Sequence, residues 1–142
     1  MKEGDSGTLW YLNRHVRLFL SVACGCLASA LFAFLMFGAY RSVWPAYALA
    51  EPIRGYTLEM LTARLLVGAS CAMAGGLVAA FVSGRRSASW WFGAIMLGVS
   101  LRPHLVTARA YYPAWYHLLY LGYIVPLAGL GGNLARRVRS HA

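Results

Sequence analysis

Two histidines are the side chains in this sequence best suited to chemistry. His104 follows a proline at the end of one apolar run, and His117 lies near the start of the next. We therefore expect them at a similar depth and close together. Neutral imidazoles can bind haem iron axially or hold a metal ion. A closed metal site needs three or four ligands, however, and no Cys or Asp joins this pair. We expect interfacial hydrogen-bonding histidines and no cofactor, with haem held by His104 and His117 as the alternative.

Two arginines are surrounded by apolar sequence on the same side. If Trp90 and Trp91 mark a membrane interface, Arg102 lies about 17 Å farther along a helix, within the hydrocarbon. A charge at mid-bilayer costs about 2.5–3.5 kcal/mol on insertion scales, so Arg102 needs a partner or a route to water. Glu59, near the start of a helix, is predicted to pair with Arg102, which leaves Arg64 for an anion. The alternative is that both arginines snorkel to the headgroups. The predicted anion or lipid site comprises Arg64, Arg102, Glu59, His104 and His117.

Aromatic residues recur at helical spacing in the last third of the chain. The tyrosines follow positions i, i+4, i+8 and i+11, which places them on one side of a helix. Such a ladder could line a groove for a quinone or a lipid tail. The alternative is helix packing, with the outermost rings in the interfacial belt. The candidate groove residues are Tyr112, Trp115, Tyr116, Tyr120 and Tyr123.

The composition indicates that lipid surrounds the elements that position these groups. Of the 142 residues, 60% are hydrophobic and only 12% are charged. In a typical soluble domain roughly a quarter of the residues are charged. The low charged fraction of this chain therefore excludes a single water-soluble core. The formal net charge is +9, from 13 Lys and Arg against 4 Asp and Glu. Because the basic residues flank apolar runs, they indicate membrane topology and contact with anionic lipids, and not nucleic-acid binding.

The apolar runs predict one all-α membrane domain over residues 1–142, a bundle of four transmembrane helices. The expected spans are residues 18–40, 60–82, 90–106 and 114–134. We expect Pro126 to kink the last span without breaking it. The loop from Arg41 to Glu59 is expected to lie at the outer interface.

Basic residues predict that both termini are cytoplasmic. More Lys and Arg fall on the side of the termini than on the opposite side, which favours that side as the inside. The residues on the predicted cytoplasmic side are Lys2, Arg14, Arg17, Arg85, Arg86, Arg136, Arg137 and Arg139. Those on the opposite side are Arg41, Arg54, Arg64, Arg102 and Arg109.

Small residues recur at every fourth position of the second apolar run. Such a stripe lets two backbones approach closely, so it predicts a helix-packing face. The sequence leaves open whether the partner helix belongs to the same chain, a second copy or another protein. The stripe consists of Gly68, Ala72, Gly76, Ala80 and Gly84.

The sequence lacks the residues that several classes of enzyme reaction require. The three cysteines, Cys24, Cys26 and Cys71, all lie inside apolar runs, which favours packing over a disulfide or a redox pair. No phosphate-binding glycine loop, hydrolase serine motif or acidic metal pair occurs. Nothing in the sequence therefore indicates an enzyme.

Short segments in two of the expected spans form a recognisable pattern. The last span opens with an aromatic-Pro-x-Trp-Tyr-His-Leu segment at 112–118, and Val-Pro-Leu and Gly-Gly follow at 125–127 and 131–132. The second span contains Thr-Ala-Arg-Leu at 62–65 and Ala-Gly-Gly at 74–76. In these segments the chain resembles a group of small four-helix membrane proteins of proteobacteria. The resemblance implies the four-helix architecture and a bacterial inner-membrane location, but no activity. It also points to Arg64, Trp115, Tyr116 and His117.

These patterns together predict a non-enzymatic, multi-pass accessory or interaction subunit of the inner membrane. Its expected partners are membrane lipids and other membrane chains or a second copy of itself. One alternative is a redox subunit that binds haem or quinone through the histidines and the tyrosine ladder. A second is a small permease for an anionic solute, with Arg102 in its path.

Overall fold

The computed structural model consists of five α-helices and one π-helical turn over the described part of the chain, with no strands there. It describes the backbone of residues 4–140 and the side chains of residues 14–140. The elements are α1 (Gly4–Val43), α2 (Pro45–Ile53), α3 (Leu58–Ser83), α4 (Ser87–Arg102), the π-helical turn η1 (Pro103–Thr107) and α5 (Ala114–Ser140). The all-α fold class is thus confirmed. Lys2, counted above in the topology, lies outside the described residues.

Three helices are long and apolar enough to cross a membrane, which indicates a multi-pass membrane protein. They are Arg14–Val43 within α1, α3 and α5. The fourth expected span, 90–106, is not among them. Its α-helix ends at Arg102 after 16 residues, about 24 Å at 1.5 Å per residue, against about 30 Å of hydrocarbon. Pro103 has no backbone N–H for the next helical bond, and the chain continues as η1, whose Ala108 N–H donates to the Pro103 carbonyl over 2.7 Å.

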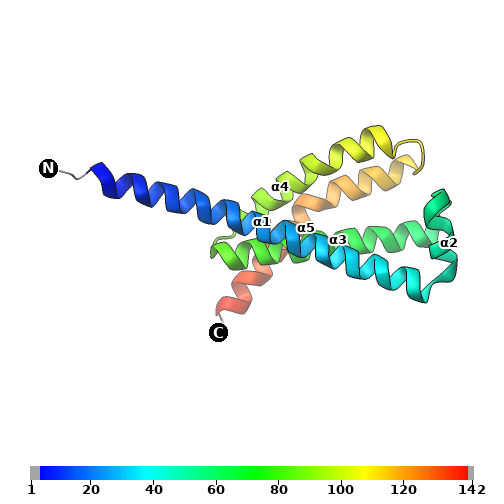
Figure 1. Cartoon of the computed structure of the whole chain (residues 1–142), viewed down its shortest axis with the longest axis horizontal. Coiled ribbons are helices and arrows are strands. Elements are labelled where there is room, and N and C mark those ends of the chain that lie inside the picture. Colours follow the sequence, from blue (N-terminus) through cyan, green and yellow to red (C-terminus); the bar gives the residue numbers. More distant parts are fainter. Residues whose placement is uncertain (1–3, 141–142) are drawn as a thin grey trace.

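Glycines allow α3 and α5 to touch backbone to backbone. A Cβ atom on Gly76 would collide with the backbone of Ala128, and one on Gly131 would collide with the backbone of Met73. The two helices cross near the end of the bundle that holds both termini and diverge toward the opposite end (Figure 1). Beyond the crossing, Gly68 of α3 faces the rings of Tyr120 and Tyr123. The stripe predicted for helix packing is therefore occupied by α5 of the same chain.

One member of that stripe, Gly84, also ends the helix. Gly84 follows the last residue of α3 with φ 73°, a left-handed conformation that ends the helix, and its N–H donates to the Ala80 carbonyl. Glycine adopts this conformation without the steric cost that other residues meet. Gly84 thus makes the turn between α3 and α4, and it also lies against α5, because a Cβ there would meet the Arg139 guanidinium.

The centre of the bundle is filled by one ring and several small side chains. Phe92 of α4 is fully buried and packs with Val22, Ala79, Ala88 and Ala128. Its ring occupies the space that a Cβ on Gly75 would need. Gly25 of α1 approaches the Gly75 carbonyl in the same layer. Small residues on α1 and α3 therefore bring α4 into the core.

Helix α5 bends near Pro126, and the segment from Arg41 to Glu59 contains a helix. Helix α5 continues through Pro126 and changes direction between its orange and red halves (Figure 1), so the predicted kink without a break is confirmed. The expected interfacial loop from Arg41 to Glu59 instead contains α2, whose Tyr47 is fully buried. The residues before α3 thus belong to the packed structure.

The α3–α5 contact predicts that Gly76 tolerates no side chain. We expect Gly76→Ala to lower the free energy of unfolding by about 1–3 kcal/mol, because backbone atoms of Ala128 cannot rotate away. The matched control is Gly98→Ala in α4, where an added Cβ meets nothing within 4 Å. This control should be neutral or slightly stabilising, since Ala favours helix over Gly. Thermal unfolding in mild detergent compares the two, and equal midpoints would show that the contact is not close.

Candidate functional site

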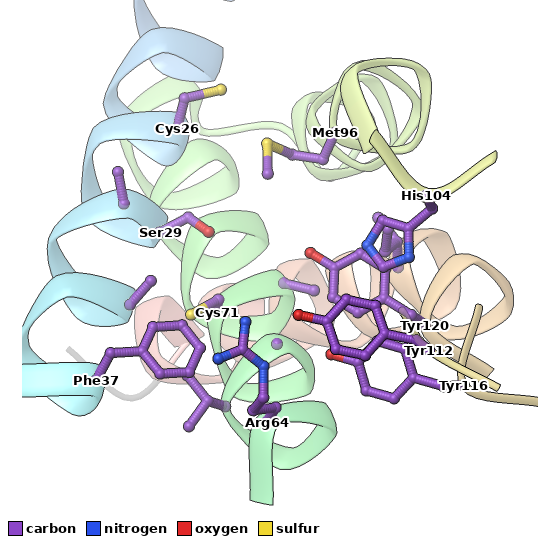
Figure 2. Close-up of a pocket in the computed structure, with 16 residues that line it drawn as sticks. Cys26, Ser29, Phe37, Arg64, Cys71, Met96, His104, Tyr112, Tyr116 and Tyr120 are labelled. Atoms are coloured by element: carbon purple, nitrogen blue, oxygen red, sulfur yellow. The ribbon is translucent and has the colours of Figure 1, made fainter. Parts of the chain in front are cut away.

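A cavity of about 360 Å³ lies between the diverging helices. Its walls come from α1, α3, α4, η1 and α5 together with Tyr112 of the loop before α5. Most of the lining is apolar or aromatic, and Arg64 contributes the only guanidinium or carboxylate among the described lining residues. Figure 2 shows the Arg64 guanidinium between the Phe37 ring on one side and the Tyr112 and Tyr116 rings on the other. The cavity size lies within the range of small-molecule sites.

Tyrosines from α2 and from the turn after it hold Arg64 in place. The Nη1 atom of Arg64 donates to the Tyr47 hydroxyl at 2.5 Å and to the Tyr56 hydroxyl at 3.1 Å. The guanidinium also lies over the rings of Phe37 and Tyr56, with its carbon 4.9 and 4.7 Å from their centroids. Burial raises the pKa of Tyr47, and it raises that of Tyr56 to about 12. Both hydroxyls therefore stay neutral at physiological pH and accept from the arginine without cancelling its charge.

The nearest carboxylate to Arg64 is already paired with another arginine. Glu51 accepts from Arg41 Nε at 2.5 Å and from Arg41 Nη2 at 3.0 Å. Its hydrogen bond to Arg41 holds the pKa of the Glu51 carboxyl below the ordinary value. Arg64 Nη1 lies 4.0 Å from Glu51, at the outer limit of an ion pair. Two guanidinium groups thus share one negative charge.

Arg64 also keeps an unused donor. Its hydrogen bonds to Tyr47 and Tyr56 leave from Nη1, and its Nε is buried without a hydrogen-bond partner in the described structure. An unpaired buried donor on a charged group costs more than about 1–3 kcal/mol. An acceptor atom supplied by a ligand would remove that cost.

The two histidines meet at the wall of the cavity, as their positions in the sequence suggest. His104 Nδ1 and His117 Nδ1 are 3.0 Å apart, a hydrogen-bond distance, and the rings stand at 87°. A metal ion that joins two imidazoles in line separates their nitrogens by about 4 Å. The pair therefore does not fit haem or a metal between the two rings. Among the described side chains, no group of three or more His, Cys, Asp or Glu could hold a metal ion.

Three of the five candidate groove residues line the cavity. Tyr112, Tyr116 and Tyr120 form part of its wall, and His104 stacks on the Tyr120 ring at 4.2 Å between centroids. Tyr123 instead donates from its hydroxyl to the Leu65 carbonyl at 3.0 Å and ties α5 to α3. Trp115 is 38% exposed on the outside of the bundle. The tyrosine ladder therefore serves both the cavity and the packing.

The predicted pairing of Glu59 with Arg102 is wrong. Both side chains are exposed, and the ion pairs among the described side chains both use Glu51. Neither residue lines the cavity. Glu59 lies in the first turn of α3, where it faces away from the bundle, and Arg102 ends α4. Of the five residues predicted for an anion site, the structure brings together Arg64, His104 and His117.

The partners of Arg64 were not predicted from the sequence. Tyr47, Glu51 and Tyr56 all fall in the segment from Arg41 to Glu59, for which the sequence predicts only a loop at the outer interface. The cavity also includes Cys26, Cys71 and Met96. Helical spacing could not identify these residues as neighbours because they come from separate elements.

Comparisons with known proteins assign no family or function to this site. No protein-family model, curated protein or solved structure matches the chain. The resemblance to small proteobacterial membrane proteins stays a prediction.

The tyrosine contacts predict that Tyr47→Phe weakens the fold around Arg64. The change removes one acceptor from a partly buried cation, so we expect a loss of about 1–3 kcal/mol in unfolding free energy. Tyr40→Phe is the matched control, because Tyr40 packs in the same aromatic cluster and its hydroxyl forms no hydrogen bond to the described residues. Thermal unfolding of both variants in detergent makes the comparison. If the two changes cost the same, the Tyr47 hydroxyl does not anchor Arg64.

Proposed function

We propose that this chain is a non-enzymatic, four-span accessory subunit of a bacterial inner membrane that binds an anion, such as a lipid headgroup, at Arg64. The observation that carries the proposal is a partly buried arginine that lines an apolar cavity and keeps a buried, unpaired Nε. Isolated charges in apolar surroundings are costly and mark functional sites in membrane proteins. An anion in the cavity would neutralise this charge.

The shape of the free edge of Arg64 favours an oxyanion. In a guanidinium, Nε and Nη2 lie along one edge, and Nη1 lies on the other side. Because Tyr47 and Tyr56 use Nη1, the Nε–Nη2 edge would present two parallel donors to a ligand for which the side chains around the buried Nε make room. Carboxylates and phosphates accept such a pair in bidentate fashion. The geometry thus supports a carboxylate or phosphate ligand over a spherical anion.

The charge balance favours the same conclusion. Arg41 and Arg64 together carry two positive charges, and Glu51 supplies one negative charge between them. Glu51 lies closer to Arg41, so Arg64 has the weaker neutralisation. An anion at the free edge of Arg64 would complete the balance without displacing Glu51.

The rest of the cavity favours a ligand with an apolar portion. Ala30, Ala33 and Met96 belong to its lining, together with the aromatic rings. Such a wall offers few hydrogen bonds to a small hydrated ion. A headgroup at Arg64 with part of its tail against these residues would use both kinds of lining.

Native mass spectrometry tests the binding proposal directly. Wild-type protein in non-ionic detergent is titrated with phosphatidylglycerol, with diacylglycerol of the same chains and with inorganic phosphate. We expect phosphatidylglycerol to bind, and Arg64→Gln to weaken it at least about tenfold, equivalent to 1.4 kcal/mol. Arg64→Lys should bind more weakly than wild type, because an ammonium lacks the two-donor edge.

Arg102→Gln is the matched control for this experiment. It removes a guanidinium that is exposed and outside the cavity, so binding should not change. Binding of inorganic phosphate alone would identify a free anion as the ligand and not a lipid. Equal binding of phosphatidylglycerol and diacylglycerol, or no effect of Arg64→Gln, would contradict an anion site.

The proposed topology places both termini in the cytoplasm and α4 with η1 across the membrane. Both ends of the described chain lie at one end of the bundle together with the α3–α4 turn (Figure 1). Arginines near this end lie over aromatic rings, Arg86 over Trp90 and Arg139 over Phe81. Cations beside aromatic rings are common at a membrane interface, and the excess of arginines there favours the inside.

Thiol labelling in intact bacterial cells tests this topology. In a chain without its native cysteines, Ala110→Cys in the α4–α5 loop should react with a membrane-impermeant reagent. Ser87→Cys at the start of α4 should react only after the membrane is opened. Because α4 and η1 connect these positions, labelling of both from the same side would show that this segment does not cross.

A further inference from the structure

The pair His104 and His117 has a capacity that anion binding alone does not use. At 3.0 Å between the two Nδ1 atoms, one ring donates its proton and the other accepts it. In the neutral pair, the donor ring therefore has an unprotonated Nε2, and the acceptor ring carries its single N–H proton on Nε2. An additional proton can join the free Nε2 of the donor ring while the hydrogen bond between the rings stays intact. The pair can thus hold one more proton without rearrangement.

The surroundings of the pair oppose that proton in the empty cavity. His117 is 7% exposed, and its Nε2 is buried without a partner in the described structure. The titratable groups that line the cavity with His104 are Cys26 of α1, Arg64 and Cys71 of α3, Tyr112 of the loop, and Tyr116 and Tyr120 of α5. Apart from the arginine these are hydroxyls and thiols, which give no negative charge at neutral pH. Arg64 repels a second cation, and Glu51 is held by Arg41.

An anion in the cavity reverses this balance. It would lie in a space that both Arg64 and His104 line, so its charge would offset the repulsion from the guanidinium. The same charge would attract a proton to the imidazole pair in surroundings that screen little. We infer that the cavity binds its anion together with one proton, which the His104–His117 pair takes up. This inference rests on the proposed function.

The linkage between anion binding and proton uptake sets the direction in which the affinity for the anion changes with pH. A site that binds more protons with ligand than without it gains affinity as the pH falls. One proton per ligand corresponds to at most a tenfold rise in affinity per pH unit, and the change falls within about pH 5.5–7.5, where histidines titrate. A purely electrostatic arginine site would show no such dependence for a ligand of constant charge.

Isothermal titration calorimetry with a short-chain phosphatidylglycerol tests this coupling, because its phosphodiester does not titrate in that range. The binding heat of the wild-type protein is measured at one pH in two buffers of different ionisation heat. We expect a difference that corresponds to uptake of about half to one proton, and an affinity that rises several-fold per unit of falling pH. Equal heats in the two buffers, with binding that still depends on Arg64, would overturn the coupling and leave the anion site standing.

Two histidine variants locate the proton. His104→Gln should abolish the slope of affinity against pH, whatever affinity remains at neutral pH. His15→Gln, an exposed histidine on α1 outside the cavity, should keep the wild-type slope. If His104→Gln retains the slope, the hydrogen-bonded pair is not what takes up the proton, and the inference fails. If Arg64→Gln binds as well as wild type, the proposed function fails as well. Should His104→Gln not fold, the buffer comparison on wild-type protein still decides.

Discussion

The backbone contact between α3 and α5 is the constraint on which the rest of the structure depends. Gly76 and Gly131 remove the side chains that would separate the two helices, so the carbonyls and α-carbons of one helix touch the other. Without a hydrophobic force between helices in lipid, such close packing is a main source of association. Farther along, Gly68 meets the rings of Tyr120 and Tyr123. Larger side chains there keep the helices apart, and the cavity lies in the resulting space.

The cavity places an arginine among rings that orient it without neutralising it. Tyr47 and Tyr56 accept from a single nitrogen of Arg64, and the nearest carboxylate is engaged by Arg41. A guanidinium held in this way loses little additional side-chain entropy on binding a ligand, since its position is already set. The short helix α2 is therefore part of the site, because it carries both Tyr47 and Glu51.

The histidine pair adds a second chemical property to the same space. His104 belongs to η1, which forms because Pro103 interrupts the α-helical bonds of α4. His117 belongs to the first turns of α5. π-helical turns occur often at functional sites, since they displace side chains from regular helical positions. Here the turn brings the His104 ring onto Tyr120 and against His117.

Local patterns in the sequence predict the all-α class, four spans of which three are long apolar helices in the structure, and the approximate place of the polar groups. Runs of apolar residues and glycine spacing depend only on neighbours along the chain, so they can be recognised without a fold. The nearness of His104 and His117 was predictable for the same reason, as a short connection separates them. Tertiary structure alone decided that Glu51 and not Glu59 pairs with an arginine, and that Arg64 and not Arg102 faces a cavity. Those choices depend on how α2 packs against α1 and α3, and no local pattern encodes the meeting of side chains from separate helices.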